Sequence, residues 1–184
     1  MQRLNPRSRA DRYGRRINRD HSPLLVYIVP WLSIMLGSAI AVLPLSATIP
    51  IMPPLGFLLL LGWRLLRPGL LPLWCALPLG AFDDLFSGQP FGSAILLWSL
   101  AMIAIEIFES RFPWRGFWQD WFTAGIAVLG YLTAALVFSG TSPSIHHVIA
   151  SLPQLMLSII LYPIIARLVA ALDRLRLLRI RVIS

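Results

Sequence analysis

The sequence contains no lysine and only one cysteine, Cys75, and charged residues make up only 13% of its 184 positions. A single cysteine excludes an internal disulfide framework. Soluble globular domains carry roughly 25% charged and about 45–50% apolar residues, whereas this chain is 57% apolar and has a mean hydropathy of +0.73. The shortage of charge and the excess of apolar residues exclude an ordinary water-soluble domain and favour an integral membrane protein.

Sequence motifs of catalysis and cofactor binding are also missing. No glycine-rich phosphate loop, Ser-His-Asp arrangement or acidic metal cluster occurs, so we expect no bound cofactor or metal ion, while an enzyme that works inside the bilayer stays an alternative. The sixteen basic residues, all arginine, against eight acidic ones give a net charge of +8. In a soluble chain this balance would suggest nucleic acid. Here membrane topology explains the arginines better, and we expect no nucleic-acid partner.

Charged residues divide the chain into apolar stretches long enough to cross a bilayer. A straight spanning helix needs roughly 20 mainly apolar residues. The stretches 21–63 and 121–166 have room for two such helices each, and 85–105 for one. A further span before Leu85 reaches full length only if Asp83 and Asp84 enter or border the membrane. The sequence therefore predicts an all-α polytopic integral membrane protein with six transmembrane helices, at about 24–44, 50–66, 69–86, 91–109, 120–140 and 147–170.

The placement of arginine predicts the orientation. Basic residues near span ends mark the cytoplasmic side of a membrane. Arginines occupy both ends of the chain and the predicted loops after the second and fourth spans, whereas the other predicted turns contain none. Both termini are therefore predicted to be cytoplasmic. The predicted organisation is an Arg-rich disordered tail at 1–22, a six-helix transmembrane domain at 23–172 and a basic cytoplasmic end at 173–184.

The N-terminal part of the chain leaves alternatives open. A signal peptide cleaved at Ala39-Ile40-Ala41 competes with the first span, but the apolar stretch continues for about a full span without a clear short hydrophobic region. The tail arginines contact either anionic lipid, at about 1 kcal/mol for each residue, or a cytoplasmic protein partner. These arginines are Arg7, Arg9, Arg12, Arg15, Arg16 and Arg19.

Two adjacent aspartates, Asp83 and Asp84, are the most informative charges. A carboxylate inside a membrane costs about 2.5–3.5 kcal/mol on insertion scales and usually faces the protein interior or water. One interpretation is a proton or cation site. The other, which we favour, is a structural anchor that caps the next helix, with Ser87 as a second acceptor for free backbone N–H groups. The intervening turn would be made by Gly88, Pro90 and Gly92.

Aromatic residues alternate with arginine between the fourth and fifth predicted spans. Such a run would serve as a stacking surface for nucleic acid on a soluble chain, but between two apolar spans it is typical of an aromatic belt at the membrane interface. The residues of this predicted belt are Trp114, Arg115, Trp118 and Trp121.

Two further features concern the ends and faces of the predicted helices. Glu106 and Glu109 lie one turn apart, as in a paired-carboxylate site, but Arg111 follows at once, so we expect solvated or snorkelling charges at a helix end. Small residues allow helices in lipid to approach closely. The candidate points for such an approach, within the monomer or to a partner, are Gly37-Ser38-xx-Ala41 and Gly125-xxxx-Gly130.

The stretch from Gly80 to Gly92, GAFDDLFSGQPFG, resembles the signature of MreD, a family of bacterial rod-shape-determining membrane proteins. In that family an aspartate follows a glycine by four residues and precedes a small-Gly-x-Pro-apolar-Gly turn. Pro53-Pro54 before an apolar span that ends WRLLRP is also similar, as is Leu172-Asp173-Arg174-Leu175. The likeness covers about 24–176, and the arginine tail and Asp83 depart from it. The matching signature residues are Gly80, Asp84, Ser87, Gly88, Pro90 and Gly92.

This resemblance implies a non-catalytic subunit of the cell-elongation machinery in the bacterial cytoplasmic (inner) membrane. MreD-like proteins are associated with MreC, with the actin-like filament MreB, and with the glycosyltransferase RodA and its partner transpeptidase in peptidoglycan synthesis. The implied fold is similar to that of the substrate-binding membrane subunits of energy-coupling-factor transporters. That similarity leaves open a small-molecule-binding transporter subunit, which would need a polar pocket. A polytopic lipid-modifying enzyme is the third alternative.

Overall fold

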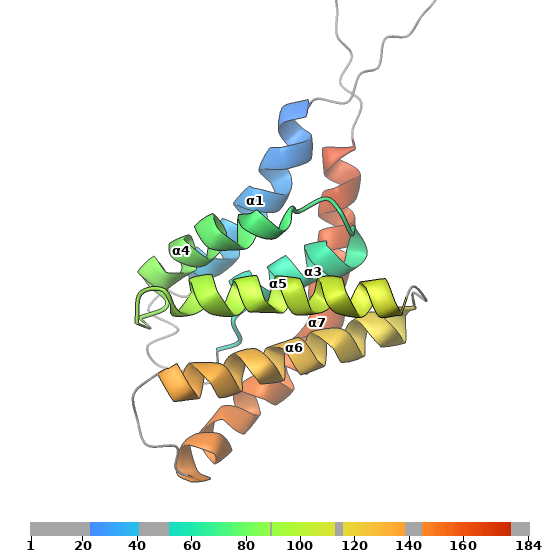
Figure 1. Cartoon of the computed structure of the whole chain (residues 1–184). Coiled ribbons are helices and arrows are strands. Elements are labelled where there is room, and N and C mark those ends of the chain that lie inside the picture. Colours follow the sequence, from blue (N-terminus) through green and yellow to red (C-terminus); the bar gives the residue numbers. More distant parts are fainter. Residues whose placement is uncertain (1–22, 41–51, 89, 113–115, 139–144, 178–184) are drawn as a thin grey trace, which may run out of the picture.

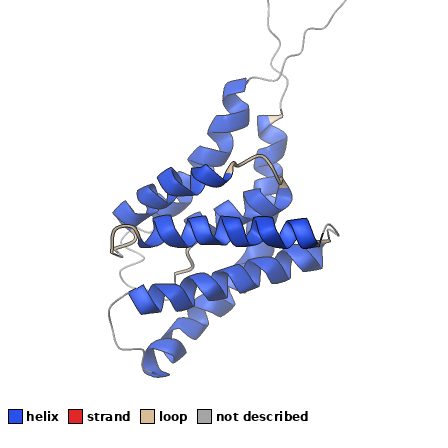
Figure 2. Cartoon of the chain, in the orientation of Figure 1, coloured by secondary structure: helices blue, strands red, loops and turns tan. Residues whose placement is uncertain are grey.

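The computed structural model describes residues 23–40, 52–88, 90–112, 116–138 and 145–177, without the side chains of 23–24 and 145–148. Within these ranges the chain is helical and forms no strand (Figure 2), which confirms the all-α prediction. The elements are α1 (Pro23–Ala39), α3 (Leu55–Leu66), the 3₁₀ turn η3 (Leu73–Cys75), α4 (Ala76–Phe86), α5 (Ser93–Arg111), α6 (Phe117–Phe138) and α7 (Ile145–Arg176).

Within the described ranges six α-helices overlap the six predicted segments; the starts of α3 and α4 and the end of α7 are among the boundaries that differ by five residues or more. Proline disfavours a helix through its own position and the preceding one, so α3 begins at Leu55, after Pro53-Pro54. The predicted segment 69–86 is helical only from Ala76, because Gly69 has a φ of +83° and Pro72 an extended ψ of 154°. Pro72 thus lies outside the helix in which we expected it. The last helix, α7, continues beyond residue 170 to Arg176.

The short helix α3 forms the centre of the bundle. All of its residues from Gly56 to Leu65 are buried, as expected for a helix that is apolar around its whole circumference. It contacts α1, α6 and α7, and the pair α4 and α5 completes the bundle (Figure 1). Its 12 residues extend about 18 Å at 1.5 Å per residue. This length is below the roughly 30 Å of a bilayer core, so α3 alone is too short to span one.

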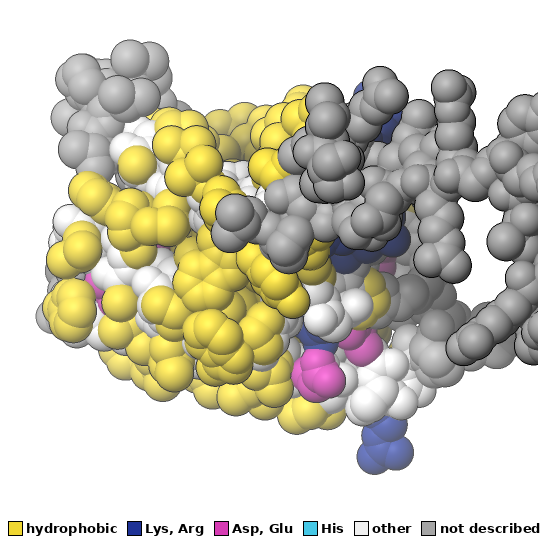
Figure 3. All heavy atoms as spheres, turned by 90° about the horizontal axis from the view of Figure 1, so that it is seen from above, with side chains coloured by type: hydrophobic (Ala, Val, Ile, Leu, Met, Phe, Trp, Pro, Cys, Tyr) yellow, Lys and Arg dark blue, Asp and Glu magenta, His cyan; other side chains and the backbone are white. Residues whose placement is uncertain are grey.

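On the face seen in Figure 3 the described surface is largely apolar, and most of its charged side chains gather toward one end. By length and composition three helices can cross a membrane: α5, α6 and the part of α7 from Ile149 to Arg176. Apolar but shorter helices are Leu25–Ala39, within α1, and α3. The predicted number of six spans therefore stays a prediction. Exposed apolar side chains that form this surface include Tyr27, Leu36, Ile107, Ile126, Val137 and Ile160.

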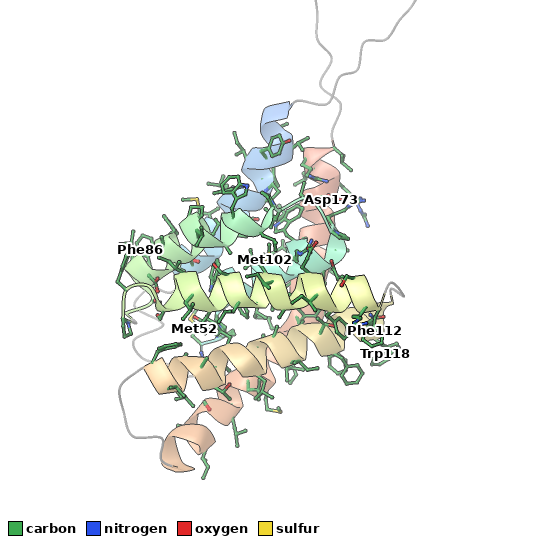
Figure 4. The ribbon with its side chains drawn as sticks, viewed as in Figure 1. Met52, Phe86, Met102, Phe112, Trp118 and Asp173 are labelled. Carbon is green, nitrogen blue, oxygen red and sulfur yellow. The ribbon has the colours of Figure 1, made fainter. Side chains whose placement is uncertain are left out.

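The bundle has two distinct ends. The C-terminal ends of α3, α5 and α7 meet at one of them, which we call the Arg64 end; α4 turns into α5 at the other, which we call the Asp84 end. Phe112, Trp118 and Asp173 lie toward the Arg64 end, and Met52 and Phe86 toward the Asp84 end (Figure 4). The start of α1 and the end of α7 lie close together (Figure 1), which is the arrangement that an even number of crossings produces.

Side chains from neighbouring helices bind two backbone carbonyls that prolines leave free. A proline has no N–H group to bind the carbonyl four residues earlier. For Pro163 this is the carbonyl of Ile159, which accepts a hydrogen bond of 3.0 Å from Trp121 Nε1. For Pro30 it is the carbonyl of Val26, which lies 3.5 Å from Arg176 Nη1. Two helix prolines thus have their free carbonyls bound from other helices, as membrane proteins require.

Candidate functional site

The carboxylate of Asp84 holds the start of α5. Its Oδ2 accepts hydrogen bonds from the backbone N–H groups of Gly92 at 2.8 Å and Ile95 at 3.3 Å. Its Oδ1 accepts the N–H of Ala94 at 2.8 Å and the hydroxyl of Ser93 at 3.2 Å. The first N–H groups of a helix have no partner within the helix, so this single buried side chain replaces several missing acceptors. These hydrogen bonds have the geometry that the structural-anchor interpretation of Asp84 predicts.

The glycines of the same stretch explain how α4 and α5 come so close. A Cβ on Gly80 would lie 2.7 Å from Ile95 Cα and 2.8 Å from Ile95 N, so only glycine fits between the helix backbones. Gly88 has a φ of +67° and Gly92 a φ of +99°, values that other L-residues rarely adopt. Between them, Pro90 O accepts the N–H of Ser93 at 3.0 Å. The described residues of the signature therefore form a tight corner between α4 and α5, which we call the Gly80–Gly92 corner.

Ser87 does not cap α5, contrary to our expectation. Its backbone N–H donates to Asp83 O at 2.8 Å and ends α4. Its buried hydroxyl has no hydrogen-bond partner within the described part of the chain, because Asp84 already occupies the N–H groups at the start of α5. The hydroxyl lines a pocket instead.

This pocket opens at the Asp84 end between α1, α3, α4, α6 and α7 and has a volume of about 670 Å³. Asp83 is the only charged side chain among its described lining residues. Gln154 Nε2 donates to Met52 O at 2.8 Å and thereby holds α7 to the segment before α3. Nothing in the sequence placed Ser38 or Gln154 beside Asp83, since they are far apart along the chain. The polar side chains of the pocket wall are Ser38, Asp83, Ser87, Tyr131, Ser151 and Gln154.

The Arg64 end contains a buried ion-pair cluster that the sequence analysis missed. Arg64, near the end of the predicted span 50–66, lies in the last turn of α3 with its side chain only 3% exposed. Its guanidinium pairs with Glu106 and, at 3.1 Å, with Glu109. The interpretation of both glutamates as solvated or snorkelling charges missed this pairing: Glu106 is 55% exposed at the helix end but paired, whereas Glu109 is only 18% exposed. Their i, i+3 spacing was the available signal, because it places two carboxylates on one helix face.

A second charge network joins three helices at the same end. Asp173 of α7 accepts hydrogen bonds from Arg67 Nε at 2.8 Å and from Arg176 Nε at 2.7 Å. The Arg176 guanidinium also lies 5.9 Å from the ring centroid of Trp63, at the end of α3. Trp63 Nε1 in turn donates to Ser33 Oγ of α1 at 2.9 Å. The end of α7 is thereby fixed to both α3 and α1.

The two described tryptophans of the predicted aromatic belt differ in their exposure. Trp118 is 67% exposed at the Arg64 end, where a belt residue is expected, whereas Trp121 is partly buried between α6 and α7 and bonded to Ile159. Trp114 and Arg115 lie outside the described residues. So do the tail arginines Arg7, Arg9, Arg12, Arg15, Arg16 and Arg19.

The two small-residue motifs differ in how closely their glycines approach other helices. A Cβ on Gly37 would lie 2.6 Å from Leu59 Cδ1 and 3.2 Å from the backbone of Gly56, so this glycine serves packing of α1 on α3 within the chain; Ala41 lies outside the described residues. Gly130 has no atom within 4 Å of its Cβ position. It lines an apolar groove of about 420 Å³ between α5 and α6, which we call the α5–α6 groove.

Comparison with known proteins identifies the family. The family model described as rod shape-determining protein MreD matches residues 20–175, and this stretch contains the whole Gly80–Gly92 corner. Searches of curated proteins and of solved structures found no match. Together with three helices able to cross a bilayer, the match shows a membrane protein with a role in determining rod shape. The chain belongs to the MreD family.

Proposed function

We propose that this protein is a non-catalytic subunit of the bacterial cell-elongation complex, which partners MreC and helps to organise lateral peptidoglycan synthesis. The observation that carries the proposal is the family match over residues 20–175. The structure is consistent with a scaffold: its described charged residues engage mainly in contacts that hold helices together, such as Asp84 at the start of α5 and Arg64 against Glu106. MreB, RodA and its partner transpeptidase are the further proposed members of the assembly.

The proposed setting is the bacterial inner membrane, crossed six times with both termini in the cytoplasm. The arrangement of charge supports this orientation, because basic residues mark the cytoplasmic side. The described arginines lie in the C-terminal parts of α3, α5 and α7 or directly after α3, so all belong to the Arg64 end. The Asp84 end would then face the periplasm. The N-terminal arginines would contact anionic lipid or a cytoplasmic partner.

For the membrane anchor of MreC we propose the α5–α6 groove as the contact surface. Association of helices in lipid relies on close packing through small residues. Gly130 leaves open space there, and the groove is otherwise lined by alanines and larger apolar side chains. The small residues of its wall are Ala101, Ala104, Ala127, Gly130 and Ala134.

Co-purification tests this proposal. The protein is solubilised in mild detergent with tagged MreC, and the amount of MreC retained is compared between wild type, Gly130→Leu and Ala150→Leu. Gly130→Leu fills the groove and is expected to reduce MreC retention strongly. Ala150→Leu adds the same side chain at an exposed position of α7 and should leave retention unchanged. Equal retention by both variants would contradict the groove, and no retention by wild type would contradict the partnership.

One observation favours the alternative of a small-molecule-binding transporter subunit, namely the polar pocket at the Asp84 end. Depletion of the protein separates the two functions. Loss of rod shape with unchanged uptake of nutrients supports the elongation role. Loss of the uptake of one nutrient with normal cell shape supports the transporter role.

A further inference from the structure

The pocket at the Asp84 end holds a carboxylate without a basic partner. Asp83 lines the pocket, and no arginine is among the described lining residues. The described arginines belong to the opposite end of the bundle, where Arg64, Arg67 and Arg176 pair with acidic residues. Asp84, its neighbour, is satisfied by the N–H groups of α5. Asp83 therefore stands apart as a negative group that faces open space.

Two hydroxyl groups of the pocket wall lie close to this carboxylate. Both oxygens are buried; Ser38 hydrogen-bonds to the Asp83 side chain, whereas Ser87 has no hydrogen-bond partner within the described part of the chain. Ser38 Oγ and Asp83 Oδ1 lie near each other on either side of Gly56, since both approach the position of its missing Cβ. Buried polar groups in proteins nearly always have a partner. A carboxylate without a basic partner, with the unpartnered Ser87 hydroxyl in the same pocket wall, indicates a ligand that brings a positive charge and hydrogen-bond donors.

Size and chemistry define the class of this ligand. A volume of about 670 Å³ is within the range of small-molecule sites, roughly 300–1,000 Å³, and is much larger than one bare ion. The described residues contain no group of three or more His, Cys, Asp or Glu that could hold a metal ion. A primary ammonium group carries one positive charge and three N–H donors. It can therefore pair with one carboxylate and still donate to hydroxyl oxygens.

We propose that this pocket binds a primary ammonium group, with Asp83 as its counter-charge and the hydroxyls of Ser38 and Ser87 as additional acceptors. Two sources present this group at a membrane surface. One is a free small amine from the aqueous phase, and the other is the headgroup of an aminophospholipid. The proposal does not depend on the elongation role, because a scaffold and a transporter subunit can each hold such a ligand.

Purified protein in lipid nanodiscs provides the test, with ethanolamine and phosphatidylethanolamine as the probes. Nanodiscs of phosphatidylglycerol and phosphatidylcholine contain no primary amine and serve as the reference. A rise in unfolding temperature when ethanolamine is added to these nanodiscs supports a free amine. A rise only when phosphatidylethanolamine is built into the nanodisc, with the lipid retained in native mass spectrometry, supports the headgroup. No rise with either probe overturns the proposal.

Three variants locate the binding. Asp83→Asn removes the charge, Ser87→Ala removes one hydroxyl, and Ala135→Phe fills the pocket from α6 without changing its charge. Asp83→Asn is expected to bind at least about tenfold more weakly, because it removes one member of a desolvated charge pair. Ser110→Ala, at an exposed position of the other end, should bind as wild type does. If Asp83→Asn fails to fold, Ala135→Phe and Ser87→Ala carry the comparison; undiminished binding by both then overturns the proposal.

Discussion

Asp84 supplies acceptors for four donors at the start of α5, and its side chain is buried. Asp84→Ala leaves these N–H groups without an acceptor and without free access to water. Hydrogen bonds to a charged group contribute about 1.5–3 kcal/mol each in favourable cases, so we expect a loss of about 2–4 kcal/mol in the free energy of unfolding. Titration with SDS from mild detergent measures it. Asp83→Ala is the matched control and should cost much less, because Asp83 accepts from none of these N–H groups.

Trp121 and Pro163 form a pair whose coupling can be measured. Trp121→Phe removes the indole N–H that binds Ile159 O and should cost about 1 kcal/mol through that hydrogen bond. In a Pro163→Ala background the new backbone N–H can bind the same carbonyl, so Trp121→Phe should cost less there. A double-mutant cycle of unfolding free energies gives the coupling. If the unfolding free-energy costs of the two substitutions are additive, Trp121 and Pro163 are not coupled. Trp118→Phe, at an exposed position, is the control and should be neutral in either background.

At single residues, the sequence allowed the role of Asp84 to be predicted but not that of Arg64. Asp84 acts on a helix only a few residues away, so its spacing to Gly92 carries the information. The partners of Arg64 lie on α5, 42 residues away for Glu106, and no local pattern specifies which helix faces α3. The same reason applies to the pocket, where Ser38, Asp83 and Gln154 come from three helices.

Among the elements, α4 and α5 depend on one position for their close approach. A Cβ on Gly80 would lie 2.7 Å from Ile95 Cα and 2.9 Å from Ala94 O, so Gly80→Ala must push the helices apart and lengthen the bonds to Asp84. We expect a loss of about 1–3 kcal/mol, as for other overpacked cores, measured by the same SDS titration. Gly130→Ala is the matched control: with no atom within 4 Å, it should be neutral or stabilising by up to about 1 kcal/mol. Equal effects of the two variants would contradict this account.

The hydropathy of the sequence predicted which segments are helical. It could not predict where the helices begin and end, because these boundaries depend on backbone dihedral angles. Residues 69–75 are as apolar as a span, yet Gly69 and Pro72 adopt non-helical dihedral angles. α3 was predicted as an ordinary span, but it is only 12 residues long and enclosed by its neighbours. A uniformly apolar stretch is compatible with both lipid and a protein core, so composition alone could not distinguish these environments.

For the whole molecule, the separation of charge between the two ends joins the fold to the proposed orientation. A buried guanidinium is tolerated only with partners, because removal of one member of a buried pair leaves an uncompensated charge. Arg64 meets this condition through Glu106 and Glu109. The cluster therefore fixes the end of α3 at the same level as the end of α5, and the link from Arg67 to Asp173 adds α7. These contacts bring the C-terminal ends of three helices to the same end of the bundle, which the proposed orientation places on the cytoplasmic side.

The proposed orientation predicts which positions a membrane-impermeant maleimide can reach. The chain's one cysteine, Cys75, is buried, so Cys75→Ala gives a background for single cysteines. Phe91→Cys lies at an exposed site of the Asp84 end and Ser110→Cys at an exposed site of the Arg64 end, and both flank the same helix, α5. In spheroplasts we expect labelling of Phe91→Cys alone, with Ser110→Cys labelled only after lysis. The reverse pattern would invert the orientation, while labelling of both positions from outside would show that α5 does not cross the bilayer. Because α5 is paired to α3 through Arg64 and to α4 through Asp84, its direction determines the direction of both neighbours, and one helix tests the topology of the bundle.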